Sequence, residues 1–457
     1  MSITIEQPQV NGLPEKEEYD LVCVGFGPAS LAIAIALHDR GIQPRVRYLE
    51  RQREFKWHGG MLLPDARMQI SFLKDLATLR DPTSKFTFIN YLKCKNRLVA
   101  FINLSTFLPL REEYNDYMTW CASHFDSQVH YGQETVSISP SRGPSGQVES
   151  WHIASRDVVT GNESSTIARN VVIAIGGKPK IPAALPDLAA DSRIIHSSSY
   201  RHVGPRISSA QNIAVIGGGQ SAAEIFNNLQ SRASSTSVTL YTGASTLKPS
   251  DDSPFVNEVF DPQNVDTFYE LSLDAQQHTL QNNKATNYGV VRPELLERLY
   301  ESMYYQRLHD PDERNWQYKI ISWREVVGHE KQLDGRIKLQ LRDTSNNRTS
   351  MSDTAFDLVI VATGYLRNSH EALLEPTKDL LETGKYEVGR DYKVRYRKDE
   401  VNNDSGVWLQ GCCEGSHGLS DMLLSILAVR GGEMVDSLFP EHIASQSLTG
   451  SPNVHRM

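Results

Sequence analysis

The sequence predicts an α/β fold with two Rossmann-like dinucleotide-binding domains and a small substrate-binding region. Two glycine-rich units carry this prediction, at residues 19–50 and 212–229. Each unit combines an apolar strand, a glycine turn and a helix, the arrangement that binds a dinucleotide pyrophosphate. One such unit could arise by chance, but two in one chain indicate paired nucleotide domains, as in enzymes that hold FAD in the first domain and NAD(P)H in the second.

The first unit begins with the apolar run 21–24, which predicts a buried strand. Residues 28–39 then predict a helix, and residues 46–49 a second strand. Gly25 permits the turn between strand and helix. Gly27 lets a pyrophosphate approach the helix N-terminus, where amide donors and the helix dipole favour an anion.

Residues that flank these glycines also suit a dinucleotide. Pro28 fits the first helical turn because its missing N–H would be unpaired there. Glu50 ends the second strand about 20 residues beyond the glycines, where a carboxylate can accept hydrogen bonds from a ribose. Ser30 replaces the third glycine of the fingerprint, which predicts slightly looser packing of helix on strand. Trp57 and His58 follow in a loop that we expect beside the bound nucleotide.

In the second unit, Gly217, Gly219 and Ala222 fit the pattern G-x-G-x-x-A, and residues 237–241 predict the next strand. An acid after this strand would favour NADH, whereas an arginine would bind the 2′-phosphate of NADPH. This chain has neither, because Gly243 lies within the sequence Thr-Gly-Ala-Ser. The absence of an acidic residue after this strand favours NADPH.

Composition excludes several other classes of protein. The 457 residues carry a net charge of -8, which disfavours nucleic acid and anionic membranes as partners. The five cysteines form no C-x-x-C pair, so a catalytic disulfide is not expected. No apolar run approaches the roughly 20 residues of a membrane span, and the polar N-terminus resembles no targeting signal. A cytoplasmic location is the expectation.

Several segments outside the glycine units also predict defined elements. Residues 68–75 combine large apolar and polar side chains. This pattern is compatible with two interpretations, a wall of the site and an amphipathic element. Residues 86–91 and 112–121 predict helices rich in aromatic residues. Residues 139–146 predict a hairpin or loop, and residues 170–177 a strand with a glycine turn.

The insertion 249–310 interrupts the second domain and is well placed to build a substrate pocket. Its paired acids, Asp251 and Asp252, could be metal ligands, but no further ligand has suitable spacing, so helix capping is favoured and no metal site is predicted. Residues 356–365 predict an apolar strand. Residues 422–430 predict a terminal helix that either points its amides at a flavin or closes the sheet.

These elements predict the following division of the chain. Residues 18–204 with 355–445 form an FAD-binding domain, 205–354 an NADPH-binding domain, 250–310 an insertion that contributes to the substrate pocket, and 1–17 and 446–457 mobile termini.

Seven blocks of sequence closely resemble the fungal L-ornithine N5-monooxygenases, flavin-dependent N-hydroxylases that begin hydroxamate siderophore synthesis. The resemblance extends from about residue 19 to 434, with the blocks in family order. They are GFGPAS from Gly25, MQISFLKDLATLRDP from Met68, GGGQSAAEIF from Gly217, SDDSPFVNE from Ser250, KATNY from Lys284, DLVIVATGY from Asp357 with His370, and HGLSDMLLSILAVRGGEM from His417.

The resemblance implies a role for each residue of an ornithine pocket. Lys74 matches the lysine that pairs with the ornithine carboxylate, and Asn257 matches an asparagine at the substrate. Asn287 matches one that lies between substrate, nicotinamide and the oxygen adduct of the flavin. Leu423 and Ser425 match the last part of the amino-acid pocket.

The resemblance also implies the cofactors, FAD and NADPH, and the residues that bind them. Met68 and Gln69 match residues beside the flavin, and Ser221 matches one at the NADPH site. The residues expected at catalysis are Asn287, Gln69 and Lys74, and Gln69 is also expected at the substrate. The expected cofactor contacts are Gly25, Gly27, Pro28, Ser30, Glu50, Trp57, His58, Met68, Gln69, Gly217, Gly219, Gln220, Ser221, Asn287, Thr363, Gly364, Tyr365 and Leu423.

One departure from the family concerns coenzyme choice. Family members usually carry an arginine that grips the 2′-phosphate where this chain has Gly243. Its loss leaves the use of NADH open, although Lys248 or Arg206 could supply charge.

The reaction implied is hydroxylation of the ornithine side-chain amine by O₂ through a C4a-hydroperoxyflavin, in a homotetramer. A lysine N6-hydroxylase and other class B flavin monooxygenases remain alternatives. A silent dinucleotide sensor is a further alternative from a different class of function.

Overall fold

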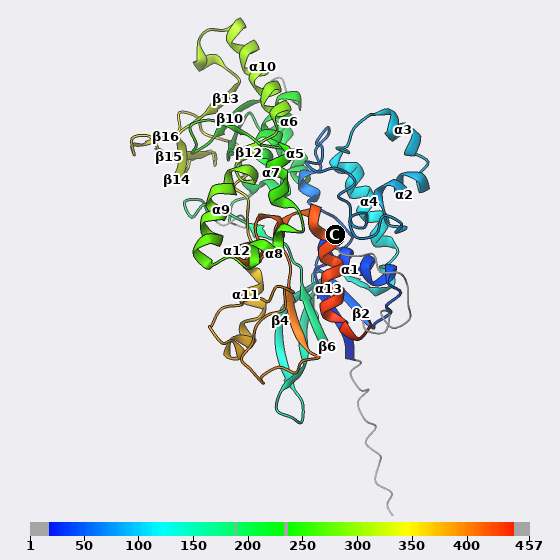
Figure 1. The fold of residues 1–457 in the computed structure, drawn as a ribbon. Coiled ribbons are helices and arrows are strands. Elements are labelled where there is room, and N and C mark those ends of the chain that lie inside the picture. The colour runs from blue at the N-terminus through cyan, green and yellow to red at the C-terminus, as the bar shows by residue number, and fades with distance from the viewer. Residues whose placement is uncertain (1–17, 187, 189, 233–235, 443–457) are drawn as a thin grey trace, which may run out of the picture.

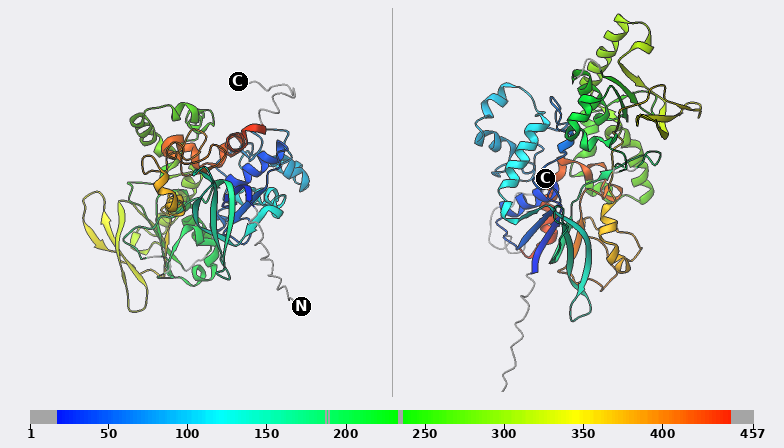
Figure 2. Two further views of the ribbon diagram at one scale, coloured as in Figure 1. Left: turned by 90° about the horizontal axis from the view of Figure 1, so that it is seen from below. Right: turned by 180° about the vertical axis from the view of Figure 1, so that it is seen from behind.

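The computed structural model describes residues 18–186, 188, 190–232 and 236–442. The termini predicted to be mobile, 1–17 and 446–457, lie outside the described residues, as do the last three residues of the predicted FAD-binding domain. Two β-sheets lie at opposite ends of the molecule, with helices of the insertion between them (Figures 1 and 2). None of the described helices is both long and apolar enough to cross a lipid bilayer.

The first sheet has the strand order β3-β2-β1-β6-β5-β4, and β19 also pairs with β6. Strands β1, β2, β3, β6 and β19 are parallel, whereas β4, β5 and β6 form an antiparallel meander. The first unit thus lies at the centre of this sheet. Its strands are β1 (Glu18–Val24), β2 (Val46–Glu50), β3 (Val129–Tyr131), β4 (Gln133–Arg142), β5 (Val148–Asp157), β6 (Glu163–Ile173) and β19 (Gly406–Leu409).

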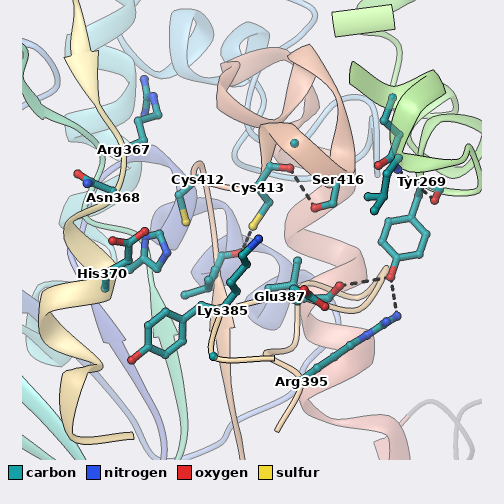
Figure 3. Close-up of a pocket in the computed structure, with 18 of the residues that line it drawn as sticks. Tyr269, Arg367, Asn368, His370, Lys385, Glu387, Arg395, Cys412, Cys413 and Ser416 are labelled. Atoms are coloured by element: carbon teal, nitrogen blue, oxygen red, sulfur yellow. Dashed lines mark hydrogen bonds between the residues drawn. The ribbon is translucent and has the colours of Figure 1, made fainter. Parts of the chain in front are cut away.

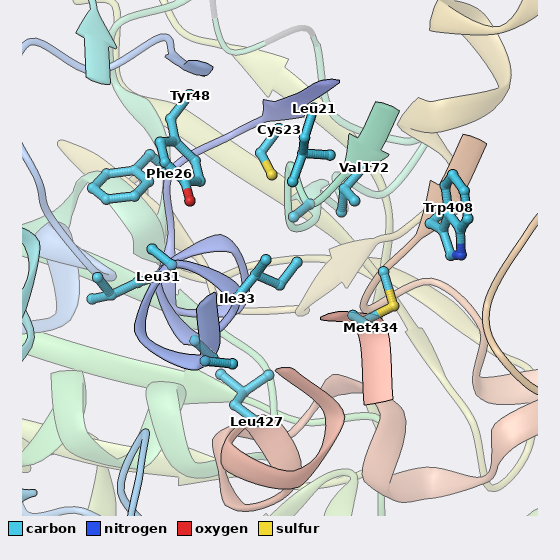
Figure 4. Close-up of a cluster of buried hydrophobic side chains, with 14 of the residues drawn as sticks. Leu21, Cys23, Phe26, Leu31, Ile33, Tyr48, Val172, Trp408, Leu427 and Met434 are labelled. Carbon is cyan, nitrogen blue, oxygen red and sulfur yellow. The ribbon is translucent and has the colours of Figure 1, made fainter. Parts of the chain in front are cut away.

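The core of this end of the molecule lies between the sheet and two helices, α1 (Pro28–Asp39) and α13 (Leu427–Leu438), which pack on each other. Strand β1 has consecutive buried residues at 21–24 because both of its faces are covered, as expected for a central parallel strand. Figure 4 shows side chains of β1, α1 and α13 meeting in one apolar cluster. Labelled members are Leu21, Cys23, Phe26, Leu31, Ile33, Tyr48, Val172, Trp408, Leu427 and Met434.

The second sheet is parallel throughout, in the order β13-β10-β9-β17-β8. It contains the second glycine unit, with β9 followed by helix α6 (Gln220–Arg232). Its strands are β8 (Ile194–His196), β9 (Asn212–Ile216), β10 (Ser237–Tyr241), β13 (Tyr318–Ile321) and β17 (Leu358–Val361).

The structure corrects the placement of two strands. Both β8 and β17 fall in ranges predicted for the first domain, yet β17 pairs with β8 on one side and with β9 on the other. The sequence pattern cannot assign such a strand to one of the two sheets, because burial on both faces selects apolar residues in either sheet. The remaining domain boundaries stay predictions.

The other strands form three small sheets, and the insertion is mainly helical. These strands are β7 (Lys178–Pro179), β11 (Lys248–Pro249), β12 (Val290–Val291), β14 (Arg324–Lys331), β15 (Ile337–Asp343), β16 (Thr349–Met351) and β18 (Tyr365–Leu366). The helices in and beside the insertion are α7 (Pro254–Asn257), α8 (Asn264–Tyr269), α9 (Leu273–Asn287) and α10 (Pro293–His309).

The remaining helices cover the ends of the two sheets. They are α2 (Phe88–Cys94), α3 (Leu98–Asn103), α4 (Arg111–Ser123), α5 (Gly204–Ser209), α11 (Ser369–Leu373) and α12 (Glu414–His417). Short 3₁₀ turns occur at η1 (Gly59–Met61), η2 (Asp126–Gln128), η3 (Ser197–Val203), η4 (Glu258–Phe260), η5 (Glu313–Asn315), η6 (Glu375–Leu380), η7 (Leu419–Met422) and η8 (Leu424–Ile426).

The terminal helix differs from the prediction, which placed it at 422–430. The turns η7 and η8 occupy the first part of that range, and α13 begins only at Leu427. Helix α13 then continues through Gly431 and Gly432, beyond the predicted end at residue 430. A Cβ atom at Gly431 would lie 2.7 Å from the carbonyl oxygen of Ala32, so this glycine allows α13 to approach α1 closely.

Candidate active site

The turn after β1 fits a dinucleotide pyrophosphate. Gly25 has φ +89°, and a Cβ atom there would lie 2.6 Å from the carbonyl oxygen of Ala174. A Cβ atom at Gly27 would meet nothing within 4 Å, so space is open above the N-terminus of α1. Ser30 is buried and donates to the carbonyl oxygen of Gly25 at 2.6 Å. This hydrogen bond holds the start of α1 to the turn, and the looser packing expected from Ser30 stays a prediction.

Glu50 lies at the end of β2, beside this turn. Its Oε2 accepts a hydrogen bond of 2.7 Å from the Phe26 amide, and its Oε1 accepts one of 2.7 Å from the Gln52 amide. The carboxylate is buried and held in one orientation, and each of its oxygens has a second lone pair. It can therefore accept further hydrogen bonds from a ribose, as the sequence predicts.

The turn after β9 has the same design. Gly217 has φ +144°, and a Cβ atom there would lie 2.4 Å from the carbonyl oxygen of Ala362. A Cβ atom at Gly219 would lie 3.5 Å from the Cα of Gly289, an ordinary contact. Ser221 lies on the first turn of α6, at the open end of this loop. The second turn can therefore also receive a pyrophosphate.

Gln220, a predicted NADPH contact, uses its side-chain amide within the protein. Its Oε1 accepts a hydrogen bond of 2.9 Å from the Arg292 amide, and its Nε2 donates to Glu224 at 2.9 Å. The amide thus fixes the start of α6 against the N-terminus of α10. A contact between Gln220 and the coenzyme stays a prediction.

Four aromatic rings lie where the chain passes between the two sheets. The His58 ring contacts those of Trp57 and Tyr365, with centroids 5.2 and 5.7 Å away, and the His196 ring is 5.0 Å from that of Tyr365. Desolvation by the surrounding groups, followed by the charges of Arg111 and Arg367, lowers the pKa of His58, although part of the residue is exposed to solvent. The lowered pKa favours the neutral imidazole.

The loop after β17 forms hydrogen bonds with strand β8 and with the residue that follows β7. The carbonyl oxygen of Gly364 lies 3.0 Å from Nε2 of His196, and the Thr363 hydroxyl donates to the carbonyl oxygen of Lys180. These bonds hold Tyr365 beside His58. Direct contacts of Thr363, Gly364 and Tyr365 with a cofactor stay predictions.

The predicted substrate residues come from three separate segments. Lys74 lies in the irregular segment 68–75, and its Nζ is 3.9 Å from Oδ1 of Asp261, which follows η4 of the insertion. Asn257 ends α7 and donates from Nδ2 to the carbonyl oxygen of Asp252 at 2.9 Å. Lys74 therefore faces the insertion, as a lysine that closes the pocket would require.

Asn287 is the last residue of α9, beside the second glycine turn. Its neighbour Gly289 contacts Gly219 of the second turn, while the hydroxyl of Tyr288 donates to Glu414 and lies 3.5 Å from Sδ of Met422. The chain around Asn287 thus joins the second glycine turn to the C-terminal segment.

Leu423 and Ser425 follow Met422 in that C-terminal segment. The hydroxyl of Ser425 is buried, and no described residue bonds it. A buried hydroxyl without a partner costs about 1–3 kcal/mol, so this atom is suited to a bound ligand. Met68 is buried and Gln69 is exposed, and their place beside a flavin stays a prediction. Among the described residues, no cluster of histidine, cysteine, aspartate and glutamate could hold a metal ion.

An ion pair that the sequence did not reveal joins the two nucleotide units. Arg111, at the start of α4, forms a bidentate pair with Glu224 of α6, with N–O distances of 2.9 and 2.8 Å. Its guanidinium also donates to the carbonyl oxygen of Met61 at 3.0 Å. The two side chains are 12% and 8% exposed. No motif marks either residue, and only the tertiary fold brings them together.

We expect the substitution Glu224→Gln to lower the free energy of unfolding by about 3 kcal/mol, because it leaves the buried guanidinium of Arg111 without its counter-charge. The matched control is Glu134→Gln, which removes an exposed pair with Arg156 and should cost less than about 1 kcal/mol. Thermal unfolding midpoints of both variants test this. Equal midpoints would show that the pair between the units contributes no more than a surface pair.

Two sheets, each with a glycine turn at the carboxyl end of a central strand that has parallel neighbours, define a dinucleotide-dependent oxidoreductase with two nucleotide domains. The family model for L-lysine 6-monooxygenase/L-ornithine 5-monooxygenase matches residues 17–367. The chain belongs to this family, and the fold class and family expected from the sequence are confirmed.

Related sequences and structures agree with this assignment. The chain is 53% identical to an L-ornithine N(5)-monooxygenase of Ajellomyces capsulatus over 92% of its length and 90% of the relative. It is 42% identical to an L-ornithine N(5)-monooxygenase of Burkholderia cepacia over 88% of its length and 90% of the relative.

Among solved structures, the ornithine hydroxylase PvdA of Pseudomonas aeruginosa superposes with a TM-score of 0.86 at 40% identity, covering 93% of this chain and 100% of PvdA. The ornithine N-hydroxylase KtzI of Kutzneria sp. 744, solved with reduced FAD, NADP⁺ and L-ornithine, superposes with a TM-score of 0.84 at 33% identity, covering 93% of this chain and 100% of KtzI.

Proposed function

We propose that the protein is an L-ornithine N5-monooxygenase that uses FAD, NADPH and O₂ in the first step of hydroxamate siderophore synthesis. Three observations support the proposal: the segment after Asn287 joins the second glycine turn to the C-terminal segment, the buried hydroxyl of Ser425 in that segment has no described partner, and Lys74 faces the insertion. The relatives at 42% and 53% identity support ornithine as the substrate.

The first glycine turn holds FAD, and the second holds NADPH. Gly25, Gly27 and Glu50 receive the FAD pyrophosphate and ribose, while Gly217, Gly219 and Ser221 receive the coenzyme. Bound FAD supplies the chemistry that passes the reducing power of NADPH to dioxygen.

The residues of the chain position the substrate and protect the reaction. Lys74 binds the ornithine carboxylate, and Ser425 offers its unpaired hydroxyl to the same pocket. Asn287 donates a hydrogen bond without releasing a proton. The lowered pKa of His58 favours its neutral form, which adds no positive charge and suits a reaction that needs the side-chain amine of ornithine unprotonated. Catalysis in this site is therefore mainly orientation and exclusion of water.

Product analysis tests the proposed function. The FAD-loaded protein, incubated with NADPH, O₂ and ornithine, should form N5-hydroxyornithine, and lysine should give less hydroxylated product. Greater hydroxylation of lysine would assign the protein to the lysine N6-hydroxylases of the same family. NADPH oxidation without any hydroxylated amine would contradict both activities.

We further propose that the protein is cytoplasmic and forms a homotetramer. Each chain divides at the predicted domain boundaries, apart from strands β8 and β17. The tetramer rests on the family resemblance. Light scattering after size-exclusion chromatography measures the assembly, and a monomeric mass would contradict it.

We expect Gly243→Arg to raise the preference for NADPH over NADH at least tenfold, because an arginine there can bind the 2′-phosphate. A Cβ atom at Gly243 would meet nothing within 4 Å, so the side chain has room. The measurement is kcat/KM for flavin reduction with each coenzyme. Gly243→Gln serves as the uncharged control, and an equal change in both variants would contradict an electrostatic effect.

A further inference from the structure

A cavity of about 930 Å³ lies between the insertion and the C-terminal third of the chain, apart from the predicted ornithine pocket. Tyr269 and Leu273 line it from the insertion, and Cys412, Cys413 and His370 line it from the opposite side. Figure 3 shows the Cys412 side chain beside the ring of His370. None of Lys74, Asn257, Asn287 and Ser425 lines this cavity.

The thiol of Cys412 lies near two other reactive groups, the imidazole of His370 and the thiol of Cys413. Cys412 follows β19, and His370 lies on α11 beside it. The neighbouring side chains of Cys413 and His370 lower the pKa of Cys412 to about 6, against the opposing effects of burial and of Asp421. Cys412 is half-buried and lines the cavity. A thiolate in such an environment is the reactive form of cysteine.

The same arrangement raises the pKa of His370. Burial acts to lower this pKa, but Cys412, with a contribution from Glu371, raises it. A histidine beside a cysteine favours the thiolate and activates it for attack on sulfur or carbon. On the far side, Cys413 is buried, and its amide donates to Asp421 at 2.7 Å.

The charges around the cavity indicate the kind of reagent that it admits. Arg367 and Lys385 line the cavity, and neither forms an ion pair with a described carboxylate. The guanidinium of Arg367 donates to the carbonyl oxygen of Gly411, one residue before Cys412. Glu371 and Glu387 also line the cavity, so it offers both signs of charge. This pattern suits a small zwitterionic molecule that carries carboxylates.

We propose that Cys412 is a site of thiol–disulfide exchange with a small carboxylate-bearing peptide disulfide, of which oxidised glutathione is the test case. The Cys412 thiolate attacks one sulfur of the disulfide, and the bond between the two glutathione sulfurs breaks as the new S–S bond forms. The second glutathione leaves as a thiolate and takes a proton from water. Cys412 is oxidised to the mixed disulfide, and one glutathione is reduced. His370 is a positioning residue that holds the thiolate.

The experiment uses the FAD-loaded full-length protein and compares two cysteines of one chain. Cys94 is exposed and free and has no such histidine, so it is the internal control. After incubation with oxidised glutathione at pH 7, peptide mass analysis should show Cys412 modified about tenfold faster than Cys94, because far more of its sulfur is thiolate. Equal or faster modification of Cys94 would overturn the proposal.

The pH dependence needs no variant. The rate at Cys412 should rise as the pH passes through about 6 and level off near pH 7. A rate that still rises steeply between pH 7 and pH 8, as for an ordinary thiol, would contradict the thiolate. His370→Gln should move the rise at Cys412 to higher pH and slow modification at pH 7, and an unchanged profile would remove His370 from the site.

The charge of the cavity is tested with two disulfides. Lys385→Ala should slow exchange with oxidised glutathione severalfold and leave exchange with the neutral bis(2-hydroxyethyl) disulfide unchanged. An equal effect on both reagents would contradict recognition of carboxylates. Lys398→Ala, an exposed lysine outside the cavity, is the matched control.

Discussion

Replacing Lys74 by alanine is expected to raise the KM for ornithine by about two orders of magnitude while flavin reduction by NADPH continues at nearly the normal rate. The side chain of Lys74 is 31% exposed, and its only described ion pair is a long one, from Nζ to Asp261 at 3.9 Å. It is therefore available to a substrate carboxylate. A charge-assisted hydrogen bond to that carboxylate contributes about 1.5–3 kcal/mol, which corresponds to roughly 10- to 150-fold in affinity.

The test is specific because Lys74→Ala should weaken ornithine binding and leave flavin reduction nearly unchanged. Steady-state kinetics give the KM for ornithine, and anaerobic stopped-flow absorbance gives the rate of flavin reduction. Asp261→Asn should change the KM less than about fivefold, because an exposed pair at this distance contributes little. Lys93→Ala, on the exposed side of α2, should change neither quantity. Equal losses of ornithine binding and flavin reduction in Lys74→Ala would contradict its role.

The parts of the fold that could be predicted are those fixed by local chemistry. The turn at Gly25, helix α1 and the carboxylate of Glu50 are encoded within a single stretch of about 30 residues, and the structure places them as expected. The second unit is equally local, so the parallel strands at the centre of both sheets and both glycine turns follow from sequence patterns. The roles of Lys74, Asn287 and Ser425 came instead from family resemblance, since no pattern of spacing indicates an ornithine pocket.

The features that could not be predicted depend on contacts between distant segments. Strands β8 and β17 read as apolar runs, and only their partners place them in the second sheet. The pair of Arg111 with Glu224 joins residues from different units. Helix α13 continues past its two glycines because α1 packs against Gly431, whereas sequence reasoning treats paired glycines as a helix end. In each case tertiary packing overrides the local signal.

The second large effect is expected from Gly217→Ala, which should reduce the rate of flavin reduction by NADPH at least 100-fold and leave FAD bound. The new methyl group would lie 2.4 Å from the carbonyl oxygen of Ala362, and φ +144° is a conformation that alanine rarely adopts. The turn between β9 and α6 must then move, and the pyrophosphate of NADPH loses the backbone amides that receive it. The first glycine turn lies in the other sheet and is unaffected.

Gly219→Ala provides the matched control two residues away. Its methyl group would lie 3.5 Å from the Cα of Gly289, so the turn keeps its shape and only the space open to the coenzyme shrinks. This variant should weaken NADPH binding yet reach a higher reduction rate at saturating NADPH than Gly217→Ala. Flavin absorbance measures bound FAD in both proteins, and dithionite should reduce the flavin of both at the normal rate. Loss of FAD from Gly217→Ala would show that the two nucleotide sites do not fold independently, and reduction by NADPH at the normal rate would place the coenzyme elsewhere.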